Sequence, residues 1–436
     1  MKITTKTLDN RQVRLTIKVD EEQTQEAMQR AARQIAKQVN IPGFRKGKAP
    51  YKLIVERYGG DTIRQEAADL LAEEVYRQAL EQEDIHPFAP ASLDKVEMDP
   101  LTFAYTIPLP PTVDAAKYRK FRLKPAKVKI AKKQVREALE RIREENALLE
   151  RAERPAALED GVVIKIEAKS SAGKTFLDRD DVQIILQADD PYPAPGFAEA
   201  LVGMTEGEQR TFTLTLPDDM PQQDLQGAKA EFTVVLKEVY DRTVPALDDD
   251  LARTVGKFDS LKELEQDVEK RLHDAAQAEA DEEYTQKVVQ AVIKQAKIAY
   301  PPVMLEESVD ELVEDLEQNV SSRLHLSLED YLRFQDQTMD GLREDLRPNA
   351  VAQLERALLL GEIVQLEKLQ VADEEIEARI EEMSAPWGIR ADEVRQSLSS
   401  PEGQRSIRNQ LLGSKAVERL VAIAKGEAPD IDQVEE

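Results

Sequence analysis

Residues 40–50 read NIPGFRKGKAP, and this stretch decides how the N-terminal part of the chain is interpreted. Two glycines and two prolines within so few residues predict a tight turn between two flanking elements. The tip of that turn carries Phe44, Arg45 and Lys46. On a chain with a formal net charge of −25, an aromatic beside several cations suits an RNA surface or an acidic protein patch. A solvated turn between two helices is the alternative that the chemistry alone leaves open.

Strand and helix patterns flank this turn on both sides. Val13, Leu15, Ile17 and Val19 recur at period 2 and predict strands over residues 1–20, with a hairpin turn at 9–10. Residues 21–39 and 51–82 follow a helical period, and residues 102–107 return to strand alternation. The sequence therefore predicts an α+β head that ends near residues 110–111.

A charged helical arm is predicted to follow the head. Residues 131–154 place Val135, Leu139 and Ile142 at helical spacing, and Pro155 acts as a stop signal. An apolar stripe on a charged helix needs a partner, so we expect the arm to pack against the C-terminal region.

Residues 161–240 consist of runs rich in β-branched residues, separated by turns with Gly, Pro and Asp. They predict a compact, mostly antiparallel β domain with one short helix near 197–202. Beyond residue 245 a helical rhythm continues, interrupted by prolines at 301–302, 348, 386 and 401. The predicted fold class is multidomain α+β, and the predicted domains are residues 1–111, 112–150, 151–243 and 244–436.

Composition excludes several classes of function. The 436 residues suggest about three domains of roughly 150 residues. The absence of Cys and the scatter of three histidines argue against thiol chemistry and a bound metal. There is no phosphate-binding GxxxxGK[ST] loop, so no cofactor is expected. Without a signal peptide or a membrane-length apolar run, we expect a cytoplasmic protein with no membrane partner.

The segment 43–50, GFRKGKAP, followed by RYG at 57–59, closely resembles the signature loop of the bacterial trigger factor family. The resemblance extends over the whole chain in the same order: head, arm, FKBP-like β domain and helical C-terminal region. It implies a ribosome-docking site at Gly43, Phe44, Arg45, Lys46 and Gly47. The implied partners are the large ribosomal subunit near the exit tunnel, through a ribosomal protein and adjacent rRNA, and nascent or unfolded polypeptides. Homodimer formation away from the ribosome is left open.

The β domain resembles the FKBP-type peptidyl-prolyl isomerase module of that family, most clearly at PGFAEAL, residues 195–201. Such an isomerase lowers a barrier of about 18–20 kcal/mol by holding a twisted amide in an apolar pocket. The resemblance implies that Phe197 forms the pocket floor and that Phe176 and Phe232 line its sides. The alternative, that these three side chains are only core of a β domain, stays open.

Other pocket positions depart from the family pattern. Ile166 and Ile184 stand where aromatics are usual, and Ala194 stands where a larger aliphatic is expected. Met220 replaces a Tyr that would donate a hydrogen bond to the substrate carbonyl. We therefore expect a weakened isomerase, with Tyr192 as a side chain that could refill part of the pocket.

The C-terminal region carries scattered apolar residues among many charges. Most must pack between helices, but a protein that holds unfolded chains should expose some of them. The candidates are Val303, Met304, Leu305, Leu312, Leu316, Leu324, Leu326, Leu332, Phe334 and Met339. The leading hypothesis is an ATP-independent chaperone with accessory isomerase activity. A dedicated prolyl isomerase and a coiled-coil adaptor are the alternatives, the second disfavoured because sustained heptads are missing.

Overall fold

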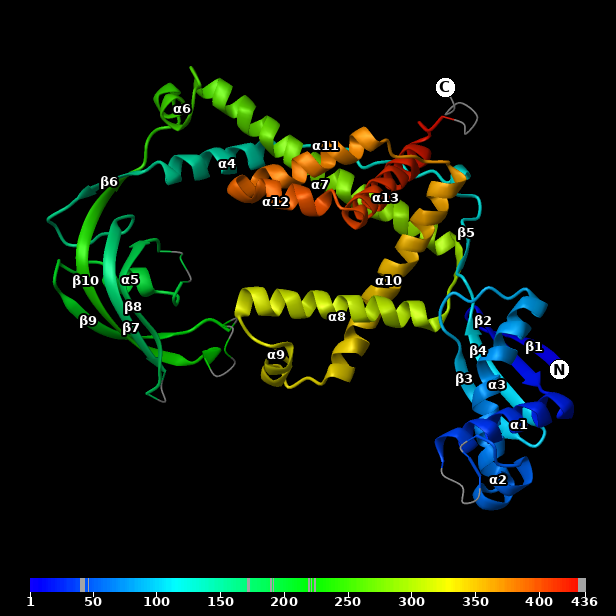
Figure 1. The fold of residues 1–436 in the computed structure, drawn as a ribbon. Helices are drawn as coiled ribbons and strands as arrows, with labels where there is room; N and C mark the ends of the chain where they lie inside the picture. Colours follow the sequence, from blue (N-terminus) through cyan, green and yellow to red (C-terminus); the bar gives the residue numbers. More distant parts are fainter. Residues whose placement is uncertain are drawn as a thin grey trace. The chain divides into compact units, whose positions relative to one another are not determined.

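The computed structural model describes residues 1–39, 44–45, 47–170, 173–188, 190, 192–218, 220, 222 and 225–429 (Figure 1). The chain divides into two compact units, Met1–Ala126 with Asp281–Glu436, and Lys127–Ala280. Among the residues described, no helix combines the length and the apolar character that a membrane span requires. The multidomain α+β fold class is confirmed.

The head is a four-stranded antiparallel sheet with helices packed against it. Its sheet has the strand order β1-β2-β4-β3. Leu15, Ile17 and Phe103 are almost completely buried and pack against Ala67 and Leu71 of a long helix. The elements are β1 (Lys2–Leu8), β2 (Gln12–Lys18), α1 (Glu21–Gln38), α2 (Tyr51–Tyr58), α3 (Gly60–Glu83), β3 (Ser92–Met98) and β4 (Leu101–Pro108).

The prediction of one continuous helix over residues 51–82 was wrong. Two helices, α2 and α3, meet at Gly59, which has φ +83° and so adopts a conformation that side-chain-bearing residues avoid. The RYGG sequence at 57–60 contains this break. Strand β3 was also missed, because its residues, SLDKVEM, are mostly exposed and show little apolar alternation.

The helical arm is shorter than predicted. Helix α4 ends at Glu145, and residues 148–151 form strand β6, which pairs with the β domain through Tyr240↔Arg151 and Thr243↔Leu148. The strand pairing overrides a charged sequence that reads as helix. The elements of this connection are β5 (Thr112–Asp114), η1 (Tyr118–Lys120), α4 (Lys132–Glu145) and β6 (Leu148–Arg151).

The apolar stripe of α4 does pack against the C-terminal region, as predicted. Leu139 is buried with Ala252, Leu264 and Val268, and Val135 and Ile142 border the same cluster. This contact fixes the arm to helices α6 (Asp249–Val255) and α7 (Leu261–Gln295).

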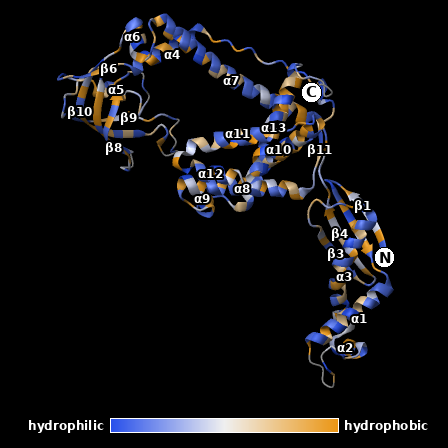
Figure 2. Ribbon diagram, turned by 45° about the horizontal axis from the view of Figure 1, so that its top comes forward, coloured by the Kyte–Doolittle hydropathy of each residue, from blue (hydrophilic) through white to orange (hydrophobic). Residues whose placement is uncertain are grey.

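The β domain is an antiparallel sheet with one short helix on it, as predicted. Its strand order is β6-β10-β7-β8, with β9 also pairing β10. Figure 2 shows hydrophobic residues gathered along these strands. Alternate residues such as Ile164, Ile166 and Val234 face the core because strand side chains alternate between faces. The elements are β7 (Gly161–Ser170), β8 (Thr175–Ile185), α5 (Phe197–Leu201), β9 (Gln209–Thr215) and β10 (Lys229–Thr243).

Between residues 244 and 429, the C-terminal region is built of helices and the loops that connect them, apart from the short strand β11 (Lys297–Ala299), which pairs β5 and was not predicted. Pro348 was expected to interrupt a helix but lies inside one. Packing outweighs the lost hydrogen bond there, because the helix is buried on both sides of the proline, at Leu342 and at Leu359. The remaining elements are α8 (Pro302–Leu324), α9 (Leu328–Phe334), α10 (Met339–Leu366), α11 (Asp373–Ser384), η3 (Ala385–Arg390), α12 (Ala391–Leu398) and α13 (Pro401–Lys425).

Candidate functional site

The loop between α1 and α2 presents part of the predicted docking site to solvent. Phe44 is 42% exposed and Arg45 is also exposed. Gly47 has φ +78°, and its N–H donates to the carbonyl oxygen of Ala36 at 2.8 Å. This hydrogen bond fastens Gly47 to the last turns of α1, while the side chains of Phe44 and Arg45 are exposed. Gly43 and Lys46 lie outside the described residues.

The seven predicted prolyl-pocket residues come together in one cluster of the β domain. They arrive from β7, β8, α5 with its preceding loop, the loop after β9, and β10. Four are buried, and three lie partly exposed at the border of the cluster. The buried ones are Ile166, Ala194, Phe197 and Phe232, and the bordering ones are Phe176, Ile184 and Met220.

The three predicted phenylalanines are in ring contact. Phe232 lies with its ring centroid 5.5 Å from that of Phe197 and 6.5 Å from that of Phe176, both in edge-to-face geometry. This arrangement is favourable because the positive edge of one ring meets the negative face of the next. Phe197 and Phe232 are 1% and 0% exposed, so solvent reaches this group only at its partly exposed members.

The sequence interpretation missed Phe212, a fourth aromatic of this cluster. Its ring is 5.6 Å from Phe197 and 6.0 Å from Phe232, and stacks on the latter. Phe212 on β9 lies directly opposite Phe232 on β10 in the sheet register. The alternation of RTFTLTL, residues 210–216, places Phe212 and Leu214 on one face and could have identified it.

Tyr192 does not refill the pocket. Its side chain is 66% exposed, while its backbone N–H donates to the Asp190 carboxylate at 2.9 Å. The expectation that it compensates for the smaller side chains was therefore wrong. The hydrogen bond to Asp190 holds the backbone locally and leaves the phenol in solvent.

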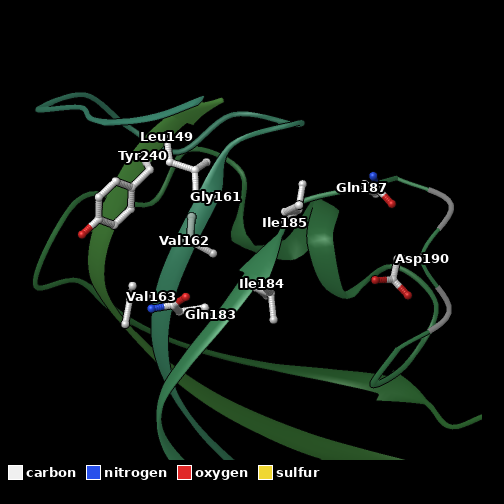
Figure 3. Close-up of a pocket in the computed structure, with 10 residues that line it drawn as sticks. All are labelled: Leu149, Gly161, Val162, Val163, Gln183, Ile184, Ile185, Gln187, Asp190 and Tyr240. Carbon is white, nitrogen blue, oxygen red and sulfur yellow. The ribbon is translucent and has the colours of Figure 1, made fainter. Parts of the chain in front are cut away.

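A cavity of about 700 Å³ opens beside the first strands of the β domain (Figure 3). It shares Ile184 with the predicted pocket, and its other lining residues lie on β6, β7, β8 and β10 and in the loop after β8. Gly161 lets the Leu149 side chain pack close to the backbone, because a Cβ there would meet Leu149 Cδ2 at 3.1 Å. The lining residues are Leu149, Gly161, Val162, Val163, Gln183, Ile184, Ile185, Gln187, Asp190 and Tyr240.

An ion pair fixes the entry of the β domain. Asp160 is 3% exposed and binds both terminal nitrogens of Arg154, at 2.6 and 2.8 Å. These bonds, with a further one to Asp241, raise the pKa of Arg154. A charged pair held this way is structural and offers no acid or base to a substrate.

Some of the predicted client-binding residues are exposed in the C-terminal region. Phe334 is 78%, Leu324 54% and Met339 43% exposed, around the ends of α8 and α9 and the start of α10. Leu332 is buried, and the other candidates are partly buried. Trp387 and Ile389, in η3, were not predicted and are 57% and 104% exposed.

Comparison with known proteins agrees with this arrangement over the whole chain. The family model described as bacterial trigger factor protein matches residues 1–142, and the model of its C-terminus matches residues 260–422. The model of FKBP-type peptidyl-prolyl cis-trans isomerase matches residues 152–237.

Individual relatives match at nearly full length. The trigger factor of Dehalococcoides mccartyi is 30% identical over 97% of this chain and 95% of its own. That of Pelotomaculum thermopropionicum is 31% identical over 98% of each. A solved structure of the trigger factor chaperone shares the fold with a TM-score of 0.58 and 24% identity, covering 97% of this chain and 99% of that one.

Proposed function

Because the chain belongs to the bacterial trigger factor family, and so has a chaperone role in protein folding, we propose that it docks on the ribosome and shelters nascent chains there. Docking would use the loop at residues 43–47, on the large subunit beside the exit tunnel, through a ribosomal protein and adjacent rRNA. The protein would act in the cytoplasm without ATP. The observation that carries this proposal is the exposed Phe44 and Arg45 at the tip of a loop fastened by Gly47.

The loop suits docking because its parts have separate tasks. Arg45 and the lysines beside it supply positive charge on an acidic protein, which speeds the encounter with an acidic surface. Phe44 supplies an apolar anchor that becomes buried only in the complex. Neither group contributes to the core of the head, so docking and folding can be tested separately.

The test is co-sedimentation of the full chain with ribosomes. The triple variant Phe44→Ala, Arg45→Ala, Lys46→Ala is expected to lose ribosome association while keeping its folded structure. The matched control Phe88→Ala, Arg77→Ala, Lys6→Ala removes the same residue types from other exposed positions of the head and should bind as wild type does. If the loop variant pellets with ribosomes at unchanged salt dependence, the docking proposal fails.

We further propose that clients are held by exposed apolar side chains of the C-terminal region. Phe334, Leu324 and Met339 are exposed near one another in sequence, in a region rich in acids and bases. Small apolar patches among charges give weak, promiscuous contacts and keep a client complex soluble. Nascent and unfolded polypeptides are therefore the proposed clients, and self-association away from the ribosome would use the same kind of surface.

The FKBP-type peptidyl-prolyl isomerase domain is present in the chain. We propose that its activity is weak and that Phe176, Ile184 and Met220 form the accessible wall of the prolyl pocket, above Phe197 and Phe232. Met220 offers no hydrogen-bond donor to a substrate carbonyl. For the domain borders we propose 1–111, 112–147, 148–243 and 244–436, moving the start of the β domain from the predicted residue 151 to Leu148 because β6 pairs β10.

A further inference from the structure

Residues 115–136, AAKYRKFRLKPAKVKIAKKQVR, contain ten lysines and arginines and no acidic residue. The chain as a whole carries a net charge of −25, which would be −35 without these ten positive charges. This stretch, called here the basic segment, connects β5 to α4 and continues into the first turn of α4 (Figure 1). It concentrates positive charge on an acidic protein. The proposals above for docking, client binding and prolyl isomerisation do not use it.

The first half of the basic segment is anchored to the helices. Tyr118 is buried, and Phe121 and Leu123 are partly buried against a cluster formed by α7, α10 and α13. The Leu123 N–H donates to the Ala424 carbonyl oxygen at 3.1 Å, and its own carbonyl accepts from Tyr284 Oη at 2.8 Å. The apolar side chains are thus used internally, and the backbone is held in place.

The lysines of the segment point into solvent. Lys117, Lys120, Lys124, Lys127 and Lys129 are all exposed, and within the described parts of the chain no ion-pair or hydrogen-bond partner reaches their ammonium groups. Arginines and lysines elsewhere in the chain commonly form ion pairs with nearby Asp or Glu side chains. Arg343 and Arg347 both bind Glu306, for example, at 3.0 and 2.8 Å. A run of unpaired cations repels itself, and a bound polyanion would relieve that repulsion.

The sequence separation of these charges limits how far apart they can lie. Residues 121–131 form neither helix nor strand, so successive residues are up to about 3.3–3.6 Å apart along the chain. Lys124, Lys127 and Lys129 then recur at intervals of at most roughly 10 Å. Because neighbouring lysines are only two or three positions apart in the sequence, the chain itself keeps these three charges close to one another. A closely spaced series of cations suits a polymer with regularly repeated negative charge.

We propose that the basic segment binds the sugar-phosphate backbone of RNA without sequence preference. A membrane surface would require an exposed apolar face, and a protein partner would require an aromatic or aliphatic anchor. Phe121 and Leu123, the apolar side chains of the anchored half, pack against the helices, and Val128 and Ile130 of the second half are only partly exposed. Contacts to phosphates carry no sequence information, and no aromatic ring of the segment is free to stack on a base. This inference goes beyond docking through the loop and does not depend on it.

The salt dependence of binding follows from the number of phosphates contacted. About five contacts to a single strand at ~0.7 each give a slope of about −3.5 for log affinity against log salt. Affinity should then fall roughly a hundredfold between about 50 and 200 mM salt. Removing four of the lysines should lower the slope by about 2.8.

The experiment measures fluorescence anisotropy of a labelled oligouridylate of about 20 nucleotides, longer than the usual site size, titrated with the full chain at several salt concentrations. The test variant is Lys120→Gln, Lys124→Gln, Lys127→Gln, Lys129→Gln. The control Lys174→Gln, Lys229→Gln, Lys257→Gln, Lys262→Gln makes the same change in net charge at exposed lysines elsewhere. The test variant should bind at least tenfold more weakly than the control at low salt, with equal thermal melting. Equal affinity of the two variants would overturn the proposal.

Two further measurements separate RNA binding by the segment from binding of an acidic protein or a membrane, and from RNA binding by the loop. Polyglutamate and anionic lipid vesicles, each at equal charge concentration, should displace the oligouridylate poorly. Displacement by either as effective as that by unlabelled RNA would assign the segment to an acidic protein or a membrane instead. The loop variant Phe44→Ala, Arg45→Ala, Lys46→Ala should bind the oligouridylate as wild type does. If it alone loses binding, the RNA contact lies in the loop, and the proposal for the basic segment is wrong whatever the outcome of ribosome docking.

Discussion

Substituting Glu367 by glutamine removes a negative charge from the centre of a buried hydrogen-bond network without changing the size of the side chain. The Glu367 side chain is fully buried after α10. Its Oε1 accepts from Tyr118 Oη at 2.6 Å and from Arg119 Nε at 2.7 Å. Its Oε2 accepts from Arg119 Nη2 and from Arg419 Nε, the latter at 2.8 Å. The network joins the segment after β5 to α10 and α13.

The expected loss of stability is about 3 kcal/mol. Breaking a buried ion pair by removing one partner costs about 3–5 kcal/mol, because the remaining charge stays buried without compensation. The side chains of Arg119 and Arg419 are 26% and 12% exposed, so water screens part of the residual charge and favours the lower end of that range. A glutamine keeps one acceptor oxygen but turns an N–H group toward the two donors that the other oxygen served.

The effect should depend on pH. Burial alone would raise the pKa of Glu367, but hydrogen bonds from Arg119, Tyr118 and Arg419 outweigh it and hold the pKa below its ordinary value of 4.5. A carboxylate with a lowered pKa stabilises the folded state above its unfolded pKa, and this stabilisation is lost as the pH falls through the folded pKa. The difference between wild type and Glu367→Gln should therefore be full at neutral pH and shrink below about pH 4.5.

Urea unfolding monitored by circular dichroism measures the change in stability, because the network holds helices α10 and α13 together. The control Glu374→Gln removes an exposed charge from α11 and should change the free energy of unfolding by less than about 0.5 kcal/mol. A loss below about 1 kcal/mol for Glu367→Gln, or a difference that does not change at acid pH, would refute the reasoning.

Three further changes test other parts of the structure. Met220→Tyr should raise the rate of proline-limited refolding several-fold by supplying a carbonyl donor worth about 1 kcal/mol, and a slower rate in a folded domain would count against the pocket. Gly47→Ala should destabilise the loop by about 1–2 kcal/mol, because φ is +78° there and the new Cβ would lie 3.0 Å from Lys37 Cγ. Weaker ribosome co-sedimentation is the readout, and unchanged binding would show that loop geometry is unimportant. A fragment of residues 112–146 joined to 246–436 keeps the apolar clusters that contain Tyr118 and Leu139. It should suppress aggregation of an unfolded client without ATP, as measured by light scattering. Failure of the folded fragment, with suppression by an isolated 148–243 domain, would move the client surface to the β domain.

Strong periodicity allowed much of the fold to be predicted from the sequence. The alternation of Val13, Leu15 and Ile17 and the β-branched runs of the β domain specify buried strand faces, and they fold as predicted. The apolar stripe on α4 was predicted to pack against other helices, and its Leu139 is buried beside Ala252. In each case the apolar face of a strand or helix must be buried, so the pattern of apolar residues determines the structure.

The misses arose where tertiary contacts override local preference. Residues 148–151 look helical but pair with β10, and Pro348 stays within α10 because packing on both sides holds it there. Exposure is also a tertiary property. Leu332 and Phe334 are two residues apart in one short helix, yet one is 5% and the other 78% exposed. The sequence could therefore suggest apolar candidates for client binding without separating exposed ones from core.

The candidate prolyl site shows the same limit. The resemblance to FKBP domains brought together seven residues that do share one cluster. Phe212 was missed although the alternation of RTFTLTL places it on one face with Leu214, and the sheet register adds that it lies opposite Phe232. The outward direction of the Tyr192 side chain, which is 66% exposed, is likewise a property of the folded domain that its local sequence does not give.

The most direct test of ribosome-linked chaperone action compares the aggregation of a client during its synthesis with the aggregation of the same client after synthesis. An aggregation-prone client is synthesised in a translation system reconstituted without other chaperones, with either the wild-type chain or the variant Phe44→Ala, Arg45→Ala, Lys46→Ala present. The same two proteins are then added to a client that has already been made and unfolded. We predict that both proteins suppress aggregation of the finished client equally, whereas wild type raises the soluble yield during synthesis and the variant does so much less at the same concentration. A variant that protects the client during synthesis as well as wild type does would contradict the proposal that the loop at Phe44 and Arg45 brings this chaperone to nascent chains.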